Sequence, residues 1–325
     1  MSQRVAKRMT IGVWWNCFAS AMQVRLWSRW SVIWTTSSAI FSRTSRSRRN
    51  QVSKACSIFM VRASRSVRCV RRVDEHMTLH GKKALVIGGA VGIGRAVCQA
   101  FAAAGACVGV ADRGWSEEKS SIVAELKASG VDAYCDEVDV RDEGSVSKVI
   151  QHAISRFGQL DILVNNAGMT SAGAPMHEQD SALWSEIFAT NVNGIAFGMK
   201  HVLPHMLERG FGRIINTSSQ LAHKPVPNHG AYCASKAAVT ALTASVAQEV
   251  ARRGITVNCV CPGMTDTAML YKGGAAFVEE KLKALPIGRP GTVAEIAATY
   301  VFLASDAAAF FIGQSLSPNG GDVMW

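Results

Sequence analysis

The sequence predicts an α/β protein with a doubly wound parallel sheet and helices on both of its faces. Downstream of Met77, short and largely apolar runs alternate with longer stretches in which apolar residues recur at helical spacing. The first apolar run leads directly into a glycine-rich turn and then into a helical stretch. Alternation of this kind favours a parallel sheet, in which ligands bind at the carboxyl ends of the strands.

Six segments are expected to be buried strands because they are brief and largely apolar. They are Ala84–Ile87, Cys107–Ala111, Ala133–Val140, Ile162–Val164, Arg213–Asn216 and Thr256–Cys261. Five helices are expected between them, with apolar residues such as Val97 and Phe101 gathered on one face. They are Gly94–Ala104, Glu117–Ser129, Glu143–Phe157, Ser181–Asn193 and Cys233–Arg253.

The composition is that of a globular protein. The 325 residues are 48% hydrophobic and 18% charged, which allows a sizeable core and excludes global disorder. The longest charge-free apolar stretch near the N-terminus, Ile11–Val24, has 14 residues and is too short for a membrane span of about 20. The nine cysteines include no CxxC pair and no histidine partner at ligand spacing, so we expect reduced thiols, a cytoplasmic location and no metal site.

The net charge of +11 is concentrated at the N-terminus. Residues 1–76 carry 15 Lys and Arg against two acidic residues, a net +13, whereas residues 77–325 carry a net −2. Because residues 1–76 also lack a sustained apolar period, we expect a basic, disordered extension followed by one domain over residues 77–325. A start misassigned upstream of Met77, a targeting peptide and a basic arm for RNA or acidic lipid each explain the extension.

The glycine-rich turn runs from Gly88 to Gly94 with the spacing GxxxGxG. Glycines there let a phosphate approach backbone N–H groups at a helix N-terminus, where the helix dipole favours negative charge. The second strand leads to Asp112, 18 residues after Gly94. A carboxylate there accepts hydrogen bonds from a ribose 2′-OH and repels a 2′-phosphate, which predicts NAD rather than NADP. Arg113 beside it partly neutralises that charge, so NADP remains the less favoured alternative.

Ser219, Tyr232 and Lys236 form a candidate catalytic group. Tyr232 and Lys236 are spaced i, i+4 at the start of an expected helix, so their side chains share one face. A phenol with a pKa of about 10 is a poor base at pH 7, and a nearby ammonium favours the phenolate. The pair therefore predicts a general acid/base, with the Ser219 hydroxyl placed to orient a carbonyl or alcohol oxygen. Each of these residues alone is structural more often than functional.

Several further motifs agree with this interpretation in order and spacing. They are Gly88-x3-Gly92-Ile93-Gly94, Asn165-Asn166-Ala167-Gly168, Asn191, Ser219, Tyr232-Cys-Ala-Ser-Lys236 and Pro262-Gly263. Together they resemble the short-chain dehydrogenase/reductase family, whose catalytic domain is a Rossmann-type dinucleotide-binding sheet. The resemblance covers about residues 78–325.

The resemblance implies a role for each matching residue. Tyr232 would be the catalytic acid/base, and Lys236 would lower its pKa and bind the nicotinamide ribose. Ser219 would hold the substrate oxygen, and Asn191 would order a water in a proton relay. Asp139-Val140 would frame the adenine. The implied cofactor-binding residues are Gly88, Gly92, Ile93, Gly94, Asp112, Asp139, Val140, Asn165, Ala167, Gly168, Tyr232, Lys236, Pro262, Gly263, Thr265 and Thr267.

Three positions depart from the family's pattern. Ile87 stands where Thr is common, Val91 replaces a frequent small polar residue, and Asn319 replaces Asp before Gly320-Gly321. The first two remove one or two local side-chain hydrogen bonds. The third should affect chain packing more than chemistry.

The sequence thus predicts an NAD(H)-dependent oxidoreductase that interconverts a secondary alcohol and a ketone, with a small-molecule substrate and no nucleic-acid or membrane partner. An NADPH-dependent 3-oxoacyl-thioester (acyl-carrier-protein) reductase is the alternative. A nucleotide sensor without turnover and RNA binding through the basic extension are weaker ones. Gln220–Gly230 and the mobile-looking Met269–Pro286 are expected to line the pocket. A homotetramer or homodimer is expected, formed through the helices with Asn191 and Tyr232 and the C-terminal strand.

Overall fold

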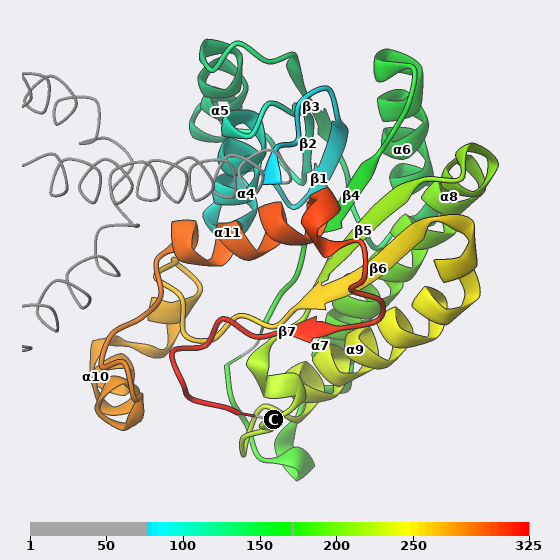
Figure 1. The fold of residues 1–325 in the computed structure, drawn as a ribbon. Helices are drawn as coiled ribbons and strands as arrows, with labels where there is room; N and C mark the ends of the chain where they lie inside the picture. Colours follow the sequence, from blue (N-terminus) through cyan, green and yellow to red (C-terminus); the bar gives the residue numbers. More distant parts are fainter. Residues whose placement is uncertain (1–76, 171, 325) are drawn as a thin grey trace, which may run out of the picture. The chain divides into compact units, whose positions relative to one another are not determined.

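The computed structural model describes residues 77–170 and 172–324, so the predicted extension, residues 1–76, lies outside the described residues. Seven parallel strands form one sheet in the order β3-β2-β1-β4-β5-β6-β7 (Figure 1). The strands are β1 Lys83–Ile87, β2 Cys107–Asp112, β3 Ala133–Glu137, β4 Ile162–Asn165, β5 Gly212–Thr217, β6 Ile255–Val260 and β7 Ser315–Leu316. The order reverses between β1 and β4, which is where doubly wound sheets bind ligands.

The helices of the described domain cover both faces of this sheet (Figure 1). They are α4 Gly92–Ala103, α5 Glu117–Ala128, α6 Glu143–Phe157, α7 Ser181–Phe188, α8 Gly194–Arg209, α9 Gly230–Val250, α10 Ala275–Ala284 and α11 Val293–Ala304. Shorter helical turns are η3 Met176–Glu178, η4 Ala189–Asn193, η5 Gln220–Ala222, η6 Ala251–Arg253, η7 Leu270–Gly273 and η8 Asp306–Ala308.

Two apolar cores result from the period of two along each strand. In β1, Ala84 and Val86 belong to a core with α4, α5 and α11, whereas Leu85 and Ile87 belong to a second core with α6, α8 and α9. All four side chains are at most 2% exposed, as expected for a central strand covered on both faces. The predicted doubly wound architecture is therefore confirmed.

The predicted strand Ala133–Val140 is too long. The observed strand β3 ends at Glu137, and Asp139 and Val140 lie in the loop that follows. The apolar residue Val138 extended the strand pattern past Glu137. Its N–H still donates to the carbonyl of Asp112, the last residue of the neighbouring strand β2, but the strand itself has ended. Asp139 and Val140 therefore lie at the carboxyl edge of the sheet.

The expected helix Ser181–Asn193 comprises two elements in the structure, and a third, α8, follows it directly. Helix α7 ends at Phe188, a π-helical turn spans Ala189–Asn193, and α8 continues from there. Helix α8 was not predicted because it contains two glycines and an internal proline, Pro204, which have poor helix propensity. Its glycines have a packing role: a methyl group at Gly198 would overlap the Asn165 side chain of β4.

The stretch Met269–Pro286, expected to be mobile, contains the turn η7 and helix α10. Helix α11 was also not among the expected elements, whereas the C-terminal strand that the resemblance implied is present as the short β7. Within residues 77–170 and 172–324, the structure has no helix with the length and apolar content that a membrane crossing requires.

Candidate active site

The glycine-rich turn joins β1 to α4 and packs tightly against the end of β4. Gly88 has a φ of +80°, and a side chain there would press on the backbone of Ala167. A methyl group at Gly94 would overlap the Gly88 carbonyl oxygen. Gly92, at the start of α4, has a φ of +54° and only Thr267 within 4 Å of an added Cβ. Gly88 and Gly94 therefore allow close packing, and Gly92 leaves open space at a helix N-terminus.

The carboxylate of Asp112 is hydrogen-bonded to the glycine-rich turn. Its Oδ2 accepts a hydrogen bond from Ala90 N at 3.0 Å, and its Oδ1 accepts one from Arg113 N at 2.8 Å. Sequence reasoning assigned this carboxylate to the ribose alone and missed its bond to the turn. A change at Asp112 will therefore alter the turn as well as the predicted contact with a ribose.

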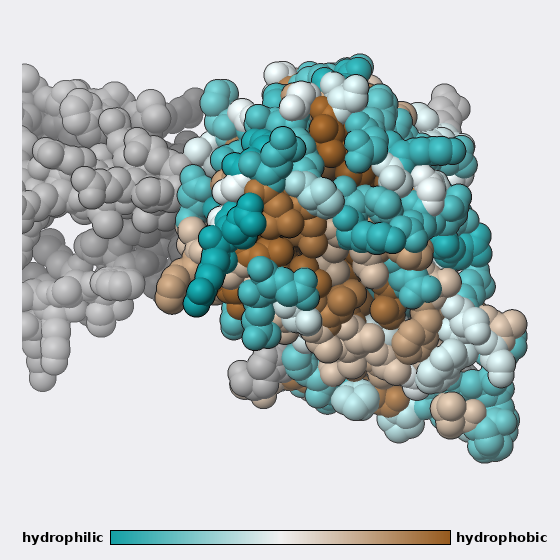
Figure 2. Space-filling model, turned by 90° about the vertical axis from the view of Figure 1, so that its right-hand side faces the viewer, coloured by the Kyte–Doolittle hydropathy of each residue, from teal (hydrophilic) through white to brown (hydrophobic). Residues whose placement is uncertain are grey.

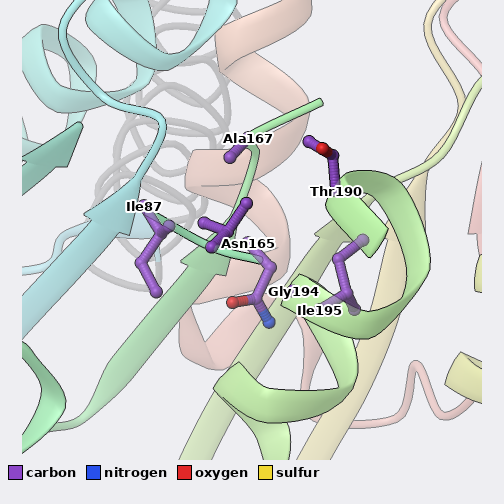
Figure 3. Close-up of a pocket in the computed structure, with 7 residues that line it drawn as sticks. Ile87, Asn165, Ala167, Thr190, Gly194 and Ile195 are labelled. Carbon is purple, nitrogen blue, oxygen red and sulfur yellow. The ribbon is translucent and has the colours of Figure 1, made fainter. Parts of the chain in front are cut away.

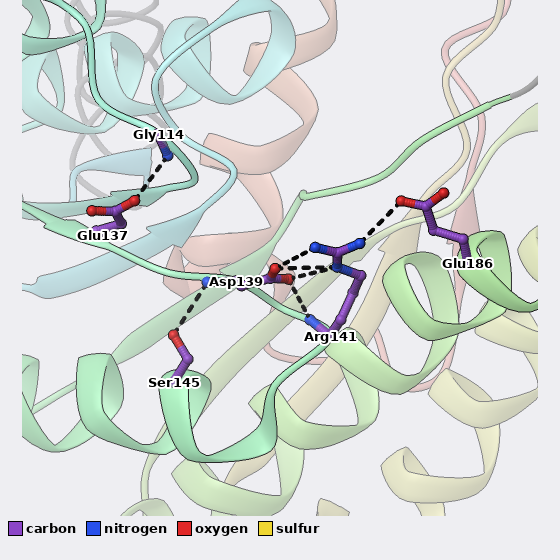
Figure 4. A network of polar contacts seen from close by, with 6 residues as sticks. All are labelled: Gly114, Glu137, Asp139, Arg141, Ser145 and Glu186. Atoms are coloured by element: carbon purple, nitrogen blue, oxygen red, sulfur yellow. Dashed lines mark hydrogen bonds and ion pairs between the residues drawn. The ribbon is translucent and has the colours of Figure 1, made fainter.

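Asp139 is engaged by a neighbouring side chain (Figure 4). Arg141 forms an ion pair with it at 2.6 Å, and that hydrogen-bonded arginine lowers the pKa of Asp139 to about 2. Arg141 also reaches Glu186 of α7 at 3.0 Å. The predicted contact of Asp139 with adenine is thus restricted to the oxygen positions that Arg141 leaves open.

A small pocket lies where β1, β4 and the α7–α8 junction meet (Figure 3). It is lined by Ile87, Val140, Asn165, Ala167, Thr190, Gly194 and Ile195. The structure thus brings together Val140, Asn165 and Ala167, as predicted for one side of a cofactor site, and adds Thr190, which no motif indicated. Ile93, by contrast, packs on the core beneath the turn.

The side chain of Asn165 links the neighbouring strands β4 and β5. Its Nδ2 donates to Asn216 Oδ1 of β5 at 2.9 Å, and its buried Oδ1 has no hydrogen-bond partner among the described residues. Ile87 lies directly opposite Asn165 in the β1–β4 register and lines the same pocket. The unsatisfied oxygen agrees with the predicted loss of a hydrogen bond where Ile87 replaces Thr.

Tyr232 and Lys236 lie on the first turns of α9, next to the end of β5. The Lys236 ammonium is 5.8 Å from the centre of the Tyr232 ring and donates to the Thr217 carbonyl at 2.9 Å. Burial lowers the pKa of Lys236 to about 8. Burial raises the pKa of Tyr232, and a hydrogen bond with Ser219 opposes that rise. The direction for Tyr232 is opposite to the sequence expectation, because desolvation is the largest influence on the pKa of this phenol.

Ser218 and Ser219 point in different directions. The Ser218 hydroxyl donates to the Lys236 carbonyl at 2.8 Å and lies 3.2 Å from the Thr240 hydroxyl, inside the protein. The Ser219 hydroxyl caps the turn η5, accepts from Leu221 N at 3.2 Å and bonds to Tyr232. The structure therefore brings Ser219, and not Ser218, to the tyrosine.

Asn191 lies in the π-helical turn and is fully buried. Its amide exchanges two hydrogen bonds with the backbone of Met169, at 2.8 and 2.9 Å, and donates to Ser235 at 3.0 Å. A methyl group at Gly168 would lie 3.3 Å from Lys236 Nζ and 3.4 Å from Asn191 Oδ1, so these three residues converge. Since its side chain is engaged, Asn191 can reach a relay water mainly through its backbone, which the π-turn displaces from regular helical bonding.

The loop after β6 faces the glycine-rich turn, since its Thr267 lies next to Gly92. Gly263 packs so closely on Asn319 that a Cβ there would lie 2.6 Å from the Asn319 Cα. Thr265 and Thr267 each donate to a backbone carbonyl of this loop, at 3.0 and 3.3 Å. The predicted structural role of Asn319 agrees with these contacts, and the two threonine hydroxyls remain able to accept.

The C-terminal segment contacts the expected substrate segment through Asp322, which sequence reasoning missed. Its carboxylate accepts from Gln220 Nε2 at 2.7 Å and from Lys224 Nζ at 2.7 Å. About 100 residues separate these partners, so no local pattern could indicate the contact. Lys224 is consequently paired with a carboxylate of the protein itself.

The buried Lys236 predicts a pH-dependent stability. Its pKa falls from an ordinary value near 10.5 to about 8 on folding, so between these values the unfolded chain binds more protons and the free energy of unfolding rises with pH. The cost of burying the charge is present in full below pH 8. We expect the difference in unfolding free energy between the parent and Lys236→Met to rise by on the order of 1 kcal/mol per pH unit from pH 8 to 10. Urea unfolding curves of both proteins measure this, and a flat difference contradicts it.

Comparison with known proteins identifies the family. Residues 82–275 match the family described as short chain dehydrogenase. A 3-oxoacyl-[acyl-carrier-protein] reductase of Staphylococcus aureus is 39% identical over 243 residues, which cover 75% of this chain and 98% of that protein. A cis-4-hydroxycyclohexanecarboxylate dehydrogenase of Sinomonas cyclohexanicum is 41% identical over 239 residues, with coverage of 73% and 95%.

Solved structures agree with the sequence matches. A Beutenbergia cavernae protein assigned as an NAD(P)-dependent gluconate 5-dehydrogenase, with NADP bound at low occupancy, has a TM-score of 0.71 and 33% identity. The similarity covers 76% of this chain and 98% of that one. With the glycine turn and the Ser219–Tyr232–Lys236 group in place, these likenesses show that the chain belongs to the short-chain dehydrogenase/reductase family of NAD(P)-binding oxidoreductases, which act on CH–OH groups.

Proposed function

We propose that the protein is an NAD(H)-dependent dehydrogenase that interconverts a secondary alcohol and a ketone. The observation that carries this proposal is the convergence of Ser219, Tyr232 and Lys236 beside the glycine turn. The described residues fit a dinucleotide: Gly88 and Gly94 have no room for a side chain, and Gly92 leaves space at a helix N-terminus. When bound, the nicotinamide would supply or accept the hydride.

The side chains of this chain would orient the substrate and move the proton. Ser219 would hold the substrate oxygen next to the Tyr232 hydroxyl. Because burial raises its pKa, Tyr232 carries its proton at neutral pH and can donate it to a carbonyl oxygen during ketone reduction. Lys236 would hold the nicotinamide ribose, and its ammonium, which is still protonated at neutral pH with a pKa of about 8, would stabilise the phenolate as it forms. Activity of the parent protein on secondary alcohols with NAD tests the proposal directly.

The preference for NAD rests on Asp112, and two observations favour NADP. Asp112 presents a carboxylate at the end of β2, where it would accept from a ribose 2′-OH and repel a 2′-phosphate. The adjacent Arg113 and the NADP in the Beutenbergia structure support the other cofactor. Initial rates with NADH and NADPH at equal concentration distinguish the two, and a parent enzyme that prefers NADPH overturns the NAD proposal.

Replacing Asp112 should shift the cofactor preference. We expect Asp112→Ala to raise the ratio of kcat/KM for NADP over NAD at least about tenfold, because a repulsive carboxylate is removed while Arg113 remains. The ratio is the quantity to measure, since loss of the bond to Ala90 N affects both cofactors alike. Asp112→Asn is the matched control, because it removes the charge and keeps an acceptor for that N–H. An unchanged ratio in both variants contradicts the assignment of Asp112.

A 3-oxoacyl-thioester reductase is the second candidate, favoured by the name of the Staphylococcus relative. The pairing of Lys224 with Asp322 favours uncharged alcohols, since that lysine is not available to a substrate carboxylate or phosphate. A screen of polyols, cyclic alcohols and 3-hydroxyacyl thioesters separates the candidates. Turnover of the thioesters alone supports the reductase.

We also propose a cytoplasmic homodimer or homotetramer. The face at the right of Figure 1, where α6, α8 and α9 lie, has its apolar residues gathered in the middle and hydrophilic residues around them (Figure 2). Phe310, next to the strand β7, is 98% exposed. Apolar surface of this kind is typical of contacts between subunits. Sedimentation of the purified protein measures the assembly, and a monomer at micromolar concentration contradicts it.

A further inference from the structure

A line of hydrogen bonds runs from α11 through the sheet to the glycine turn. The Tyr300 hydroxyl of α11 lies 2.7 Å from the Thr217 hydroxyl at the end of β5. Thr217 Oγ1 lies 3.1 Å from Asn166 Oδ1, and Asn166 Nδ2 lies 2.8 Å from the Gly88 carbonyl oxygen. None of the motifs that indicate the active site includes Tyr300 or Thr217.

The chemistry of the groups fixes the direction of every bond in this line. The Gly88 carbonyl can only accept, so the Asn166 amide must turn its NH₂ group toward it and its oxygen toward Thr217. That amide oxygen can also only accept, so Thr217 must donate its single hydroxyl proton to it. The Thr217 oxygen must therefore accept from Tyr300. Tyr300 is the donor at the head of the line, and it is 0% exposed, so water cannot replace it.

The last bond of the line holds the turn that would receive the cofactor. The Asn166 amide and the Gly88 carbonyl both lie against the Cα of Gly94, where an added methyl group would overlap them. The backbone N–H of Asn166 also donates to the Ile87 carbonyl at 2.8 Å. A rotation of the Asn166 side chain would thus shift the carbonyl of Gly88 and the N–H groups that follow it.

The same line reaches the catalytic lysine. The carbonyl oxygen of Thr217 accepts from Lys236 Nζ at 2.9 Å, while the Thr217 side chain accepts from Tyr300. Thr217 is therefore held from one side by α11 and holds Lys236 on the other. The cofactor turn therefore depends on the Thr217 side chain, whose rotamer Tyr300 sets, while the lysine is bonded to the backbone of the same residue.

We propose that Tyr300 is a positioning residue for the dinucleotide site, acting through Thr217 and Asn166 without touching cofactor or substrate. The proposal deepens the proposed function and rests on dinucleotide binding at the glycine turn. It differs from a purely structural role in what it predicts. Loss of the hydroxyl should weaken cofactor binding in protein that is still folded.

The variant Tyr300→Phe removes only the hydroxyl and keeps the ring packed in the core. We expect the dissociation constant for the preferred dinucleotide to rise about fivefold, the effect of one ordinary hydrogen bond. The cofactor KM should rise with it while kcat changes less. Calorimetric titration, performed well below the melting temperature, measures this. A dissociation constant within twofold of the parent overturns the proposal, even where the melting temperature falls.

Tyr134→Phe is the matched control. Tyr134 is also buried, but its hydroxyl has no hydrogen-bond partner among the described residues and packs over Gly109 on the other side of the strand order reversal. We expect its cofactor affinity to equal that of the parent. Equal weakening in Tyr134→Phe and Tyr300→Phe overturns the proposal, because a general effect of core hydroxyl loss would then explain both.

A double-mutant cycle tests whether the line acts as a unit. Thr217→Val removes the shared hydroxyl at nearly constant volume and should weaken binding at least as much as Tyr300→Phe. The double variant should be no weaker than Thr217→Val alone, and Thr217→Ser, which keeps the hydroxyl, should bind like the parent. Additive effects in the cycle overturn the proposal. A parent protein that binds neither NAD nor NADP overturns the proposed function instead.

Discussion

Tyr232→Phe is expected to lower turnover by at least about 100-fold while the cofactor still binds. General acid/base groups contribute about 10²–10⁴-fold to enzyme rates, and phenylalanine keeps the ring on α9 while removing the only proton the side chain can move. Removal of the hydroxyl also frees Ser219 from its hydrogen bond, without disturbing the bond from Lys236 to the Thr217 carbonyl. Steady-state rates and calorimetric cofactor titration together measure the two expectations.

The controls for this result separate chemistry from folding. Tyr134→Phe removes a hydroxyl that packs on Gly109 of β2 and has no hydrogen-bond partner among the described residues, and it should keep the parent rate. Near-normal turnover in Tyr232→Phe would remove the proton-transfer assignment. Loss of both rate and cofactor binding would instead assign Tyr232 to the binding site alone.

Gly94→Ala is the second large effect we expect. The added methyl group would overlap the Gly88 carbonyl oxygen and press on the Asn166 amide, both of which are fixed by hydrogen bonds. Overpacking of this kind costs about 1–3 kcal/mol, which corresponds to roughly fivefold to 150-fold weaker cofactor binding if the strain falls on the turn. Dissociation constants for NAD and NADP measure the loss.

Gly144→Ala provides the comparison for this substitution. Gly144 is also in the first turn of a helix, α6, but an added Cβ there meets only the Asp142 side chain, at 3.3 Å. We expect this variant to bind cofactor like the parent. Parent-like binding in Gly94→Ala would show that the turn can relax, and would contradict the close packing inferred for it.

Most of the sheet could be predicted because buried parallel strands have a local signal. The apolar run around Leu85 is covered on both faces, so its composition alone marks it as a strand. Helix α8 gave no such signal, because Gly194 and Gly198 are there for contact with Val140 and Asn165. Tertiary packing explains these residues, and single-sequence propensity does not include it.

The candidate site also has features that follow from the sequence and features that depend on tertiary packing. Tyr232 and Lys236 are four residues apart on one helix, so their proximity follows from the sequence. The engagement of Asp139 by Arg141 and the raised pKa of Tyr232 depend on rotamers and burial, which the sequence does not contain. The contact of Asp322 with Lys224 joins segments about 100 residues apart in the chain, and only folding brings them together.

That contact has a practical consequence for how the enzyme is handled in the laboratory. Asp322 is three residues from the end of the chain and is bonded to the segment expected to meet the substrate. A purification tag fused after residue 325 would begin three residues from a carboxylate that is hydrogen-bonded to Gln220 and Lys224. Kinetic constants obtained with such a fusion should therefore be compared with those of a fusion at the amino end.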